Sequence, residues 1–371
     1  MGCSEWPPDL RSLEKLSEKR FYYQVKEANS QPQRLPAYLT KCGCCLKERS
    51  AEMAKLITGG TGYIGAELAH ILVERGEEVV LFDIVISEYR IEDIKNKVKI
   101  VRGDLGNFAE VANVVKENGI TDIYHMGGLL TMVSDGNPWA SFRVNVIGTY
   151  NVLEAARLFS VNKMMFASSI GTYGLGITEV IDDLTIQRPT NFYGVGKLYC
   201  EGLGRWYMNK FGLDFRSIRY PATVGPNVRT PGHWMPPMIE DSIFGRPHEC
   251  LYAPADDPGM PLIYLTDAAR AADMVLLAPK GQIKMVNYCV SGVSDAVSVN
   301  NMETILKKRY PKTSISYRNP LGEIRVGVVK RFDDTYARNE WHWKPLYTTP
   351  EAVVEKFERD MKEHPTRFGL E

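Results

Sequence analysis

The sequence GGTGYIG at positions 59–65 constrains the fold of this chain more than any other feature. It follows a short apolar run at 54–58 and precedes apolar residues that recur at helical spacing up to Val73. A buried strand that turns at glycines into a helix is the start of a βαβ unit. Glycines let the backbone approach a diphosphate, and the helix N-terminus offers free N–H groups and a positive dipole end. The residues that we expect to bind the diphosphate of a dinucleotide are Gly59, Gly62, Tyr63, Ile64 and Gly65.

Strands and helices alternate along the chain after residue 53. The sequence predicts strands at 54–58, 78–83, 97–103, 121–126, 163–168 and 214–220, and helices at 64–73, 108–118, 143–159 and 194–210. Such alternation predicts an α/β fold with a doubly wound parallel Rossmann sheet. We expect a Rossmann domain at 53–225, a smaller C-terminal α/β substrate lobe at 226–371 with some segments returning to the Rossmann sheet, and an N-terminal extension of unknown role at 1–52.

Acidic residues follow the second and third expected strands. Asp83 closes the second strand about 20 residues after the glycines, where a carboxylate can accept hydrogen bonds from the adenosine ribose hydroxyls. Because a carboxylate there would repel a 2′-phosphate, we expect NAD rather than NADP. Asp104, which precedes Leu105, either contacts adenine or caps the next helix. A glycine turn without any ligand is the alternative for the whole region.

A tyrosine and a lysine stand four residues apart, at Tyr193 and Lys197, and therefore share one face of the expected helix. Tyrosine has a reference pKa of about 10, and a neighbouring ammonium with the positive nicotinamide ring would lower it. The strand before this helix ends at Ser168 and Ser169, where ligands of such sheets bind. The pattern indicates an acid–base site; the alternative is a serine that caps a turn and a tyrosine on the surface.

Together these motifs resemble the extended short-chain dehydrogenase/reductase superfamily, which includes the nucleotide-sugar epimerases and dehydratases, over about residues 54–355. The resemblance is carried by residues 59–65, Asp83, Asp104-Leu105, residues 145–149, Ser168-Ser169 with Tyr173-Gly174, and the Tyr193/Lys197 pair. It implies that Ser169 is the catalytic serine beside Tyr193 and Lys197. It also implies that Leu105, Tyr193, Lys197 and Tyr220 contact NAD.

Within that superfamily, the chain is most similar to the short-chain type of L-threonine 3-dehydrogenase. The matching stretches are residues 168–172, 186–189 with 193–195, 212–216, 219–221 and 260–264. Nucleotide-sugar enzymes tend to carry an arginine in the last of these. The sequence departs at 231–236, where the threonine dehydrogenases have a glycine-rich loop that bears threonine. The residues that we expect at the substrate are Thr131, His233 and Trp234, although His233 alternatively satisfies its own loop.

Composition indicates which partners this chain binds and in which cellular compartment it works. The 45 basic residues balance 45 acidic ones, so no net field favours nucleic acid or a membrane surface. No apolar run approaches the ~20 residues that span a bilayer. Cys42, Cys44 and Cys45 lack the paired spacing of zinc sites, so we expect no metal and a reducing, cytoplasmic environment. The resemblance implies a homodimer through a helix at 142–159; core packing is the alternative.

The sequence therefore predicts an NAD-dependent oxidoreductase that moves a hydride between nicotinamide and a small hydroxyl or carbonyl substrate. Tyr193 would act as general base, Ser169 would orient the substrate oxygen, and Lys197 would lower the pKa of Tyr193 and hold the nicotinamide ribose. One alternative is an epimerase, dehydratase or lyase that uses tightly bound NAD transiently. Another is a non-catalytic NAD-binding regulator. Fold likeness does not choose the substrate.

Overall fold

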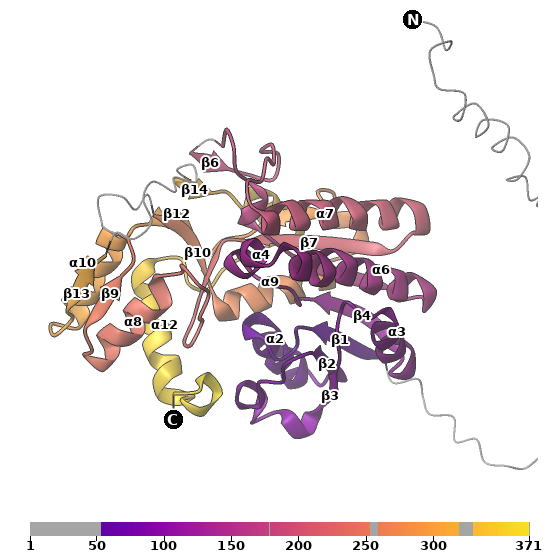
Figure 1. The fold of residues 1–371 in the computed structure, drawn as a ribbon, viewed down its shortest axis with the longest axis horizontal. Coiled ribbons are helices and arrows are strands. Elements are labelled where there is room, and N and C mark those ends of the chain that lie inside the picture. Colours follow the sequence, from indigo (N-terminus) through magenta and orange to yellow (C-terminus); the bar gives the residue numbers. More distant parts are fainter. Residues whose placement is uncertain (1–52, 178, 253–258, 319–328, 371) are drawn as a thin grey trace, which may run out of the picture. The chain divides into compact units, whose positions relative to one another are not determined.

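The computed structural model describes residues 53–177, 179–252, 259–318 and 329–370 (Figure 1). All of them belong to one compact unit that spans Ser50–Glu371. The predicted extension at 1–52, with Cys42, Cys44 and Cys45, lies outside the described residues.

A seven-stranded parallel sheet has the order β11-β7-β5-β4-β1-β2-β3. Its strands are β1 (Ala54–Thr58), β2 (Val79–Asp83), β3 (Val98–Arg102), β4 (Ile120–His125), β5 (Lys163–Ser169), β7 (Asp214–Tyr220) and β11 (Asn287–Cys289). The chain winds outwards from β1 in both directions, so the strand order reverses between β1 and β4. Ligands of doubly wound sheets bind at this reversal, beyond the carboxyl ends of the strands. The predicted Rossmann fold is confirmed.

Helices cover both faces of this sheet (Figure 1). One face carries α3 (Phe108–Glu117), α6 (Gly148–Leu158) and α7 (Phe192–Phe211), and the other carries α2 (Tyr63–Glu74), α9 (Leu265–Leu277) and α11 (Thr335–Trp341). Alternate residues of β1 supply both layers, because Leu56 packs with the first set and Ile57 with the second. Side chains on a strand point to opposite faces in turn, which explains the nearly continuous apolar strands of the sequence.

The expected single helix at 143–159 is divided in the structure. A short helix α5 (Pro138–Ser141) leads into a wider, π-helical turn η3 (Phe142–Ile147), and α6 follows. Asn145 in the wide turn accepts a hydrogen bond from Leu129 N at 2.7 Å and donates to Leu129 O at 2.9 Å. Single π-helical turns occur frequently at functional sites, and this one holds the loop after β4 in place.

A second lobe contains a mixed five-stranded sheet of order β6-β14-β12-β10-β8. Its strands are β6 (Val180–Ile181), β8 (Ala222–Val224), β10 (Met260–Tyr264), β12 (Val293–Val297) and β14 (Arg331–Phe332). A parallel pair of β9 (His248–Cys250) and β13 (Ile315–Tyr317), with α8 (Met235–Phe244), α10 (Val299–Arg309) and α12 (Pro350–Glu363), completes the lobe. Only Pro221 separates β7 from β8, so the carboxyl end of β7 lies at the junction of the two sheets.

Short elements connect these layers. They are α4 (Thr131–Gly136) and the 3₁₀ turns η1 (Glu88–Ile91), η2 (Lys95–Lys97), η4 (Ile170–Thr172), η5 (Lys280–Gln282) and η6 (Thr366–Phe368). Two strands do not follow a division of the chain at residue 225. β6 precedes that position but belongs to the five-stranded sheet, and β11 follows it but belongs to the seven-stranded sheet. None of the helices in the described ranges is both long and apolar enough to span a membrane.

Candidate active site

The glycine turn after β1 leaves no room for side chains. Gly59 has a φ of +63°, and a Cβ there would lie 2.7 Å from Gly127 Cα. A Cβ on Gly65 would lie 2.2 Å from Gly59 O, because the first turn of α2 packs directly on the loop. Gly62 caps α2 without a side-chain hydrogen bond, so the first N–H groups of the helix are not occupied by a capping side chain. This cradle fits the diphosphate of NAD.

Asp83 lies at the carboxyl end of β2 and faces a cleft of about 420 Å³. Its Oδ2 accepts hydrogen bonds from Thr61 N at 3.1 Å and Thr61 Oγ1 at 3.0 Å, and Oδ1 accepts from Ile84 N at 2.9 Å. Carboxylate oxygens have about four lone-pair sites between them, and the fourth is approached by Val85 N, at the long distance of 3.5 Å from Oδ1. A ribose hydroxyl could replace that long contact. The same carboxylate ties the glycine loop to β2.

Asp104 caps a turn and also lines the cleft. Its Oδ1 accepts from Gly106 N at 2.8 Å, and its Oδ2 accepts from Arg143 at 2.7 Å. The ion pair occupies one side of the carboxylate. Asp104 does not cap the next helix, because Asn107 caps α3 by accepting from Ala109 N at 3.1 Å. Leu105 lines the same cleft and packs close to Gly127.

Arg90 is a residue of this cleft that the sequence did not point to. Its guanidinium lies 4.0 Å from the centre of the Tyr63 ring and 5.0 Å from that of Tyr89, and Nη1 donates to Thr61 O at 3.3 Å. Arg90 belongs to the irregular segment after β2, where no periodicity marks a side chain for a site. It adds a cation to the cleft lining that also contains Asp83.

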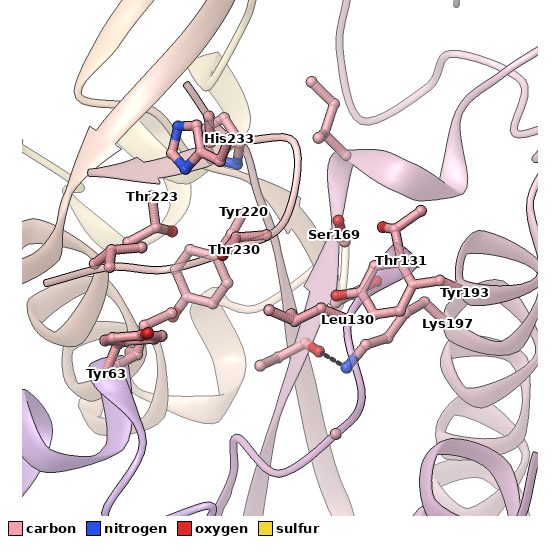
Figure 2. A pocket seen from close by; sticks show the side chains of 18 of the residues that line it. Tyr63, Leu130, Thr131, Ser169, Tyr193, Lys197, Tyr220, Thr223, Thr230 and His233 are labelled. Carbon is pink, nitrogen blue, oxygen red and sulfur yellow. Dashed lines mark hydrogen bonds between the residues drawn. The ribbon is translucent and has the colours of Figure 1, made fainter. Parts of the chain in front are cut away.

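A second cavity, also of about 420 Å³, continues from the first. The residues common to both linings are Tyr63, Ile64, Met126, Gly128, Leu130 and Ala167. In the second cavity, Figure 2 shows Ser169, Thr131, Tyr193 and Lys197 on one side and Thr223, Thr230 and His233 on the other. A dinucleotide held along the first cleft would therefore end beside these two walls.

The N-terminus of α7 packs tightly onto the end of β5. Asn191 caps the helix by accepting from Gly194 N at 2.8 Å, and a Cβ on Gly194 would lie 1.9 Å from Gly171 O. This close approach brings Tyr193 next to the segment that begins at Ser169. The structure thus brings together the three residues predicted to be catalytic, all in the lining of one cavity.

Lys197 is buried and Tyr193 is partly buried. Lys197 Nζ donates to Ala167 O at 2.6 Å (dashed in Figure 2) and lies 5.6 Å from the centre of the Tyr193 ring. Burial lowers the pKa of Lys197 to about 8 and raises the pKa of Tyr193 to about 12, although the Ser169 hydroxyl opposes the second shift. In this structure burial therefore outweighs the expected effect of the ammonium on Tyr193. The positive nicotinamide ring is the other group that we expect to favour the phenolate.

Ser169 caps a turn, as one alternative from the sequence expected, and it also lies where the other alternative requires a catalytic serine. Its Oγ accepts from Gly171 N at 3.0 Å and so caps η4. The cap uses the oxygen as an acceptor, and the hydroxyl proton can still be donated. The side chain also lines the second cavity.

The opposite wall differs from the sequence prediction at one position. His233 lines the cavity, and its buried Nε2 has no hydrogen-bond partner among the described residues. Burial lowers the pKa of His233 to about 4, so the imidazole is neutral near pH 7. Trp234, by contrast, is absent from the lining: at the start of α8 it points into the apolar core of the second lobe.

The remaining lining residues come from segments that follow β4 and β7. Thr131 begins α4 and faces the cavity, as predicted for a substrate-contacting hydroxyl. Tyr220 presents its ring to the cavity, while its hydroxyl donates to Ala268 O at 3.0 Å. Thr223 and Thr230 also line it, and the sequence did not single them out. Within the described ranges, no group of three or more His, Cys, Asp or Glu side chains is arranged to hold a metal.

A doubly wound sheet with a glycine cradle, an acidic residue at the end of β2 and a tyrosine–lysine pair defines a dinucleotide-dependent enzyme of the Rossmann class. The sequence model of the NAD-dependent epimerase/dehydratase family matches residues 55–289. The chain belongs to this family.

Individual relatives and solved structures show which members of the family this chain is similar to. The mitochondrial L-threonine 3-dehydrogenase of Bos taurus is 29% identical over 309 residues, which cover 81% of this chain and 80% of the bovine protein. Among solved structures, a GalE-like L-threonine dehydrogenase from Cupriavidus necator, in its holo form, has a TM-score of 0.75 at 26% identity, covering 82% of this chain and 99% of that one. A Thermus thermophilus UDP-glucose 4-epimerase in complex with NAD has a TM-score of 0.69 at 25% identity, with 82% and 99% covered.

These findings confirm several predictions. The cofactor is NAD, and the chain is an NAD-dependent oxidoreductase of the extended short-chain type, similar to L-threonine 3-dehydrogenases. The non-catalytic alternative loses its support, because the family and the neighbours are enzymes.

Proposed function

We propose that this enzyme oxidises the hydroxyl group of a small β-hydroxy amino acid, with L-threonine as the first candidate, or of a similar small alcohol. The observation that carries the proposal is the convergence of Ser169, Tyr193 and Lys197 on a cavity that continues from the NAD cleft. The names of the bovine and Cupriavidus relatives support threonine as the candidate.

Different residues of this chain bind the cofactor and move the proton. Gly59, Gly62 and Gly65 hold the NAD diphosphate and Asp83 holds the adenosine ribose. When bound, NAD supplies the hydride acceptor at C4 of its nicotinamide ring. Tyr193 takes the proton of the substrate hydroxyl, and Ser169 donates a hydrogen bond that orients the substrate oxygen.

Lys197 acts on Tyr193 and on the cofactor. Its ammonium is anchored at Ala167 O, between β5 and α7, so it can keep both the Tyr193 phenolate and the nicotinamide ribose within reach. Above its lowered pKa of about 8, Lys197 loses its charge, and the Tyr193 phenolate then becomes less favourable.

The substrate side of the cavity carries uncharged polar groups. We propose that Thr131 and His233, with Thr223 and Thr230, contact the substrate beyond its reacting carbon. Neutral hydroxyl and imidazole groups can each donate or accept a hydrogen bond, and this suits the mixed polar groups of an amino acid. Met260 and Pro261 supply apolar wall in the stretch where nucleotide-sugar enzymes tend to carry an arginine.

The test is NADH formation, followed at 340 nm, with NAD, L-threonine and a panel of small hydroxy compounds. We expect a rise with one member of the panel, and a loss of at least about 100-fold in Tyr193→Phe. Tyr336→Phe is the matched control, because Tyr336 is a partly buried tyrosine on α11 outside the lining of both cavities. A flat trace for every compound, with NAD retained in the purified protein, would instead favour an epimerase or lyase that recycles its cofactor.

We propose that the protein forms a homodimer through the outer surface of α5 to α7. Large apolar side chains are exposed there: Trp139, Phe142, Tyr150, Leu158, Val195, Tyr199, Trp206 and Phe211. Sedimentation velocity should show a dimer for the parent protein and a monomer for Tyr150→Glu with Trp206→Glu. Leu277→Glu, on exposed α9 surface, is the control that should stay dimeric. A monomeric parent would rule out the proposal.

Domain limits and location are also proposals. We propose a Rossmann domain at 53–225, a substrate lobe at 226–371 with some segments returning to the Rossmann sheet, and an extension of unknown role at 1–52. We propose a reducing, cytoplasmic location, supported by Cys200 and Cys289, whose buried thiols make hydrogen bonds with Asn145 O and Tyr173 Oη. Fractionation of cells would test this, and recovery with mitochondria would contradict it.

A further inference from the structure

Glu201 is a buried carboxylate for which the proposed reaction has no use. It lies on α7 eight residues after Tyr193 and four after Lys197, so the three side chains follow one stripe of the helix. Its side chain is fully buried. A buried carboxylate persists only where donors satisfy both of its oxygens.

The donors come from the two strands beside α7. Arg219 on β7 donates Nε to Glu201 Oε1 at 3.0 Å and Nη2 to Oε2 at 2.7 Å, which is a two-pronged ion pair. Ser168 on β5 donates its Oγ to Oε1 at 2.5 Å. Ser168 and Arg219 are direct partners in the register of β5 and β7. One carboxylate therefore joins the helix to both strands at the same level.

This level is next to the reacting groups. Ser168 immediately precedes Ser169, so the hydrogen bond from Ser168 holds the strand end that carries Ser169. Glu201 holds the helix that carries Tyr193 and Lys197. A slide or rotation of α7 against β5 would change the distance from Tyr193 to Ser169, and Glu201 opposes it.

Arg219 extends the connection to the segment before α7. Its Nη1 donates to Tyr173 Oη at 2.8 Å and to Asp183 O at 3.3 Å, and its Nη2 also donates to Gln187 Oε1 at 3.1 Å. All of the nitrogens of the guanidinium are thus engaged, in a planar fork that tolerates little displacement. The segment that leads into Tyr193 is held by the same arginine.

We propose that Glu201 is a positioning residue: through Ser168 and Arg219 it sets α7 against β5 and so holds Tyr193 and Lys197 at working distance from Ser169. This inference rests on the proposed function, which assigns those three residues to the reaction. A misplacement of about 1 Å in such a site can lower the rate about 100-fold.

The test uses the full chain saturated with NAD, at a temperature well below unfolding. In Glu201→Gln the shape is kept and the charge is lost. Tyrosine labelled with ¹³C at Cζ, with the Tyr193 signal assigned from Tyr193→Phe, reports the ionised fraction of Tyr193 at pH 9.5 by NMR. We expect that fraction to fall in Glu201→Gln, because a displaced α7 moves Tyr193 away from the Ser169 hydroxyl, whose hydrogen bond lowers the pKa of Tyr193. We also expect kcat to fall about tenfold or more, with the acid limb of its pH profile moved to higher pH.

Two further variants keep the test decisive. Ser168→Ala removes one hydrogen bond but leaves the Arg219 ion pair, so it should fold and change Tyr193 in the same direction by less. Asp214→Asn breaks a comparable buried ion pair with Arg216 at the other end of β7. It should lower the melting temperature and leave the ionised fraction of Tyr193 unchanged.

The possible outcomes separate the two proposals. If Tyr193 is not ionised even in the parent protein with NAD, the proposed function is contradicted. If Tyr193 is ionised in the parent and equally in folded Glu201→Gln and Ser168→Ala, only the positioning role is wrong. In a double-mutant cycle, Glu201→Gln should add little to the loss in Tyr193→Phe, because both act through one group.

Discussion

The ammonium of Lys197 on α7 donates a hydrogen bond of 2.6 Å to the backbone oxygen of Ala167 on β5. Strand and helix are thereby joined one turn from Tyr193, and the charge lies in a buried position. The same burial that suits the role proposed for Lys197 lowers the pKa of its ammonium to about 8. Function and stability therefore make opposite demands on this residue.

Lys197→Met should inactivate the enzyme and stabilise the fold at neutral pH. The folded pKa lies below the usual lysine value, so the unfavourable buried charge is fully present below pH 8 and is relieved as pH rises from there towards 10.5. We expect a gain of about 1–2 kcal/mol at pH 7, after the lost hydrogen bond to Ala167, and a smaller gain at pH 10. Urea unfolding at the two pH values measures it. A less stable variant at pH 7 would contradict the argument.

Gly65→Ala should weaken NAD binding at least tenfold. The new Cβ would lie 2.2 Å from Gly59 O, so the cradle must open where the diphosphate is expected. Titration of protein fluorescence with NAD gives the Kd. Gly202→Ala is the matched control, since nothing lies within 4 Å of a Cβ there and alanine favours the helix by about 0.5–1 kcal/mol. Equal NAD affinity in both variants would refute the assigned role of Gly65.

Asp83→Ala should reduce the preference for NAD over NADP. Removal of the carboxylate takes away acceptors for the ribose hydroxyls, which we expect to weaken NAD about tenfold, and also removes the repulsion of a 2′-phosphate. Arg90 in the same lining is a cation that would then face such a phosphate. The Kd values for both cofactors measure the effect, and Glu92→Ala, an exposed acidic residue nearby, should leave them unchanged. An unaltered ratio in Asp83→Ala would exclude Asp83 as the discriminating residue.

Asp183→Asn should stabilise the protein more at pH 8 than at pH 4. Burial raises the pKa of Asp183 to about 7, and its Oδ2 has no partner among the described residues. The neutral acid therefore favours the fold below pH 4, and this contribution is lost as pH rises through 7. Asparagine stays neutral and keeps the acceptor for Cys289 N, so we expect a gain of about 1–3 kcal/mol at pH 8. Thermal unfolding at both pH values checks the sign; a gain that is larger at pH 4 would contradict it.

The local elements of the first domain were predictable from the sequence. The apolar run at 54–58, the glycines at 59–65 and the helix after them appear in the structure within a residue or two of the predicted limits. Likewise, a spacing of four on a helix was enough to place Tyr193 and Lys197 on one face of α7. Backbone sterics and side-chain periodicity act between residues close in the chain, so a single sequence records them.

The division of the helix at 142–147 was not predictable. Asn145 bonds the backbone of Leu129, from another segment, and the wide turn accompanies that contact. Helical spacing alone reports which side of a helix is apolar, and it carries no sign of a partner so far away in the chain.

Neighbouring residues in one loop were separated only by the tertiary structure. His233 and Trp234 both stood in the stretch expected at the substrate, yet the start of α8 points Trp234 into the lobe core and leaves His233 at the cavity. Arg90, Thr223 and Thr230 reach the clefts from irregular segments or a short strand. No periodicity marks such positions.

What the sequence by itself determined was the Rossmann sheet, the glycine cradle and the spacing of Tyr193 and Lys197, because each depends on local geometry. Only the tertiary structure decided which distant side chains come together. Ser168 and Arg219 both bind Glu201, and His233 lines the same cavity as Tyr193, on the opposite side. These contacts depend on how crossover connections bring β5, β7 and α7 together. Residues as far apart in the sequence as Ser168 and Arg219 become partners only after the whole sheet is wound.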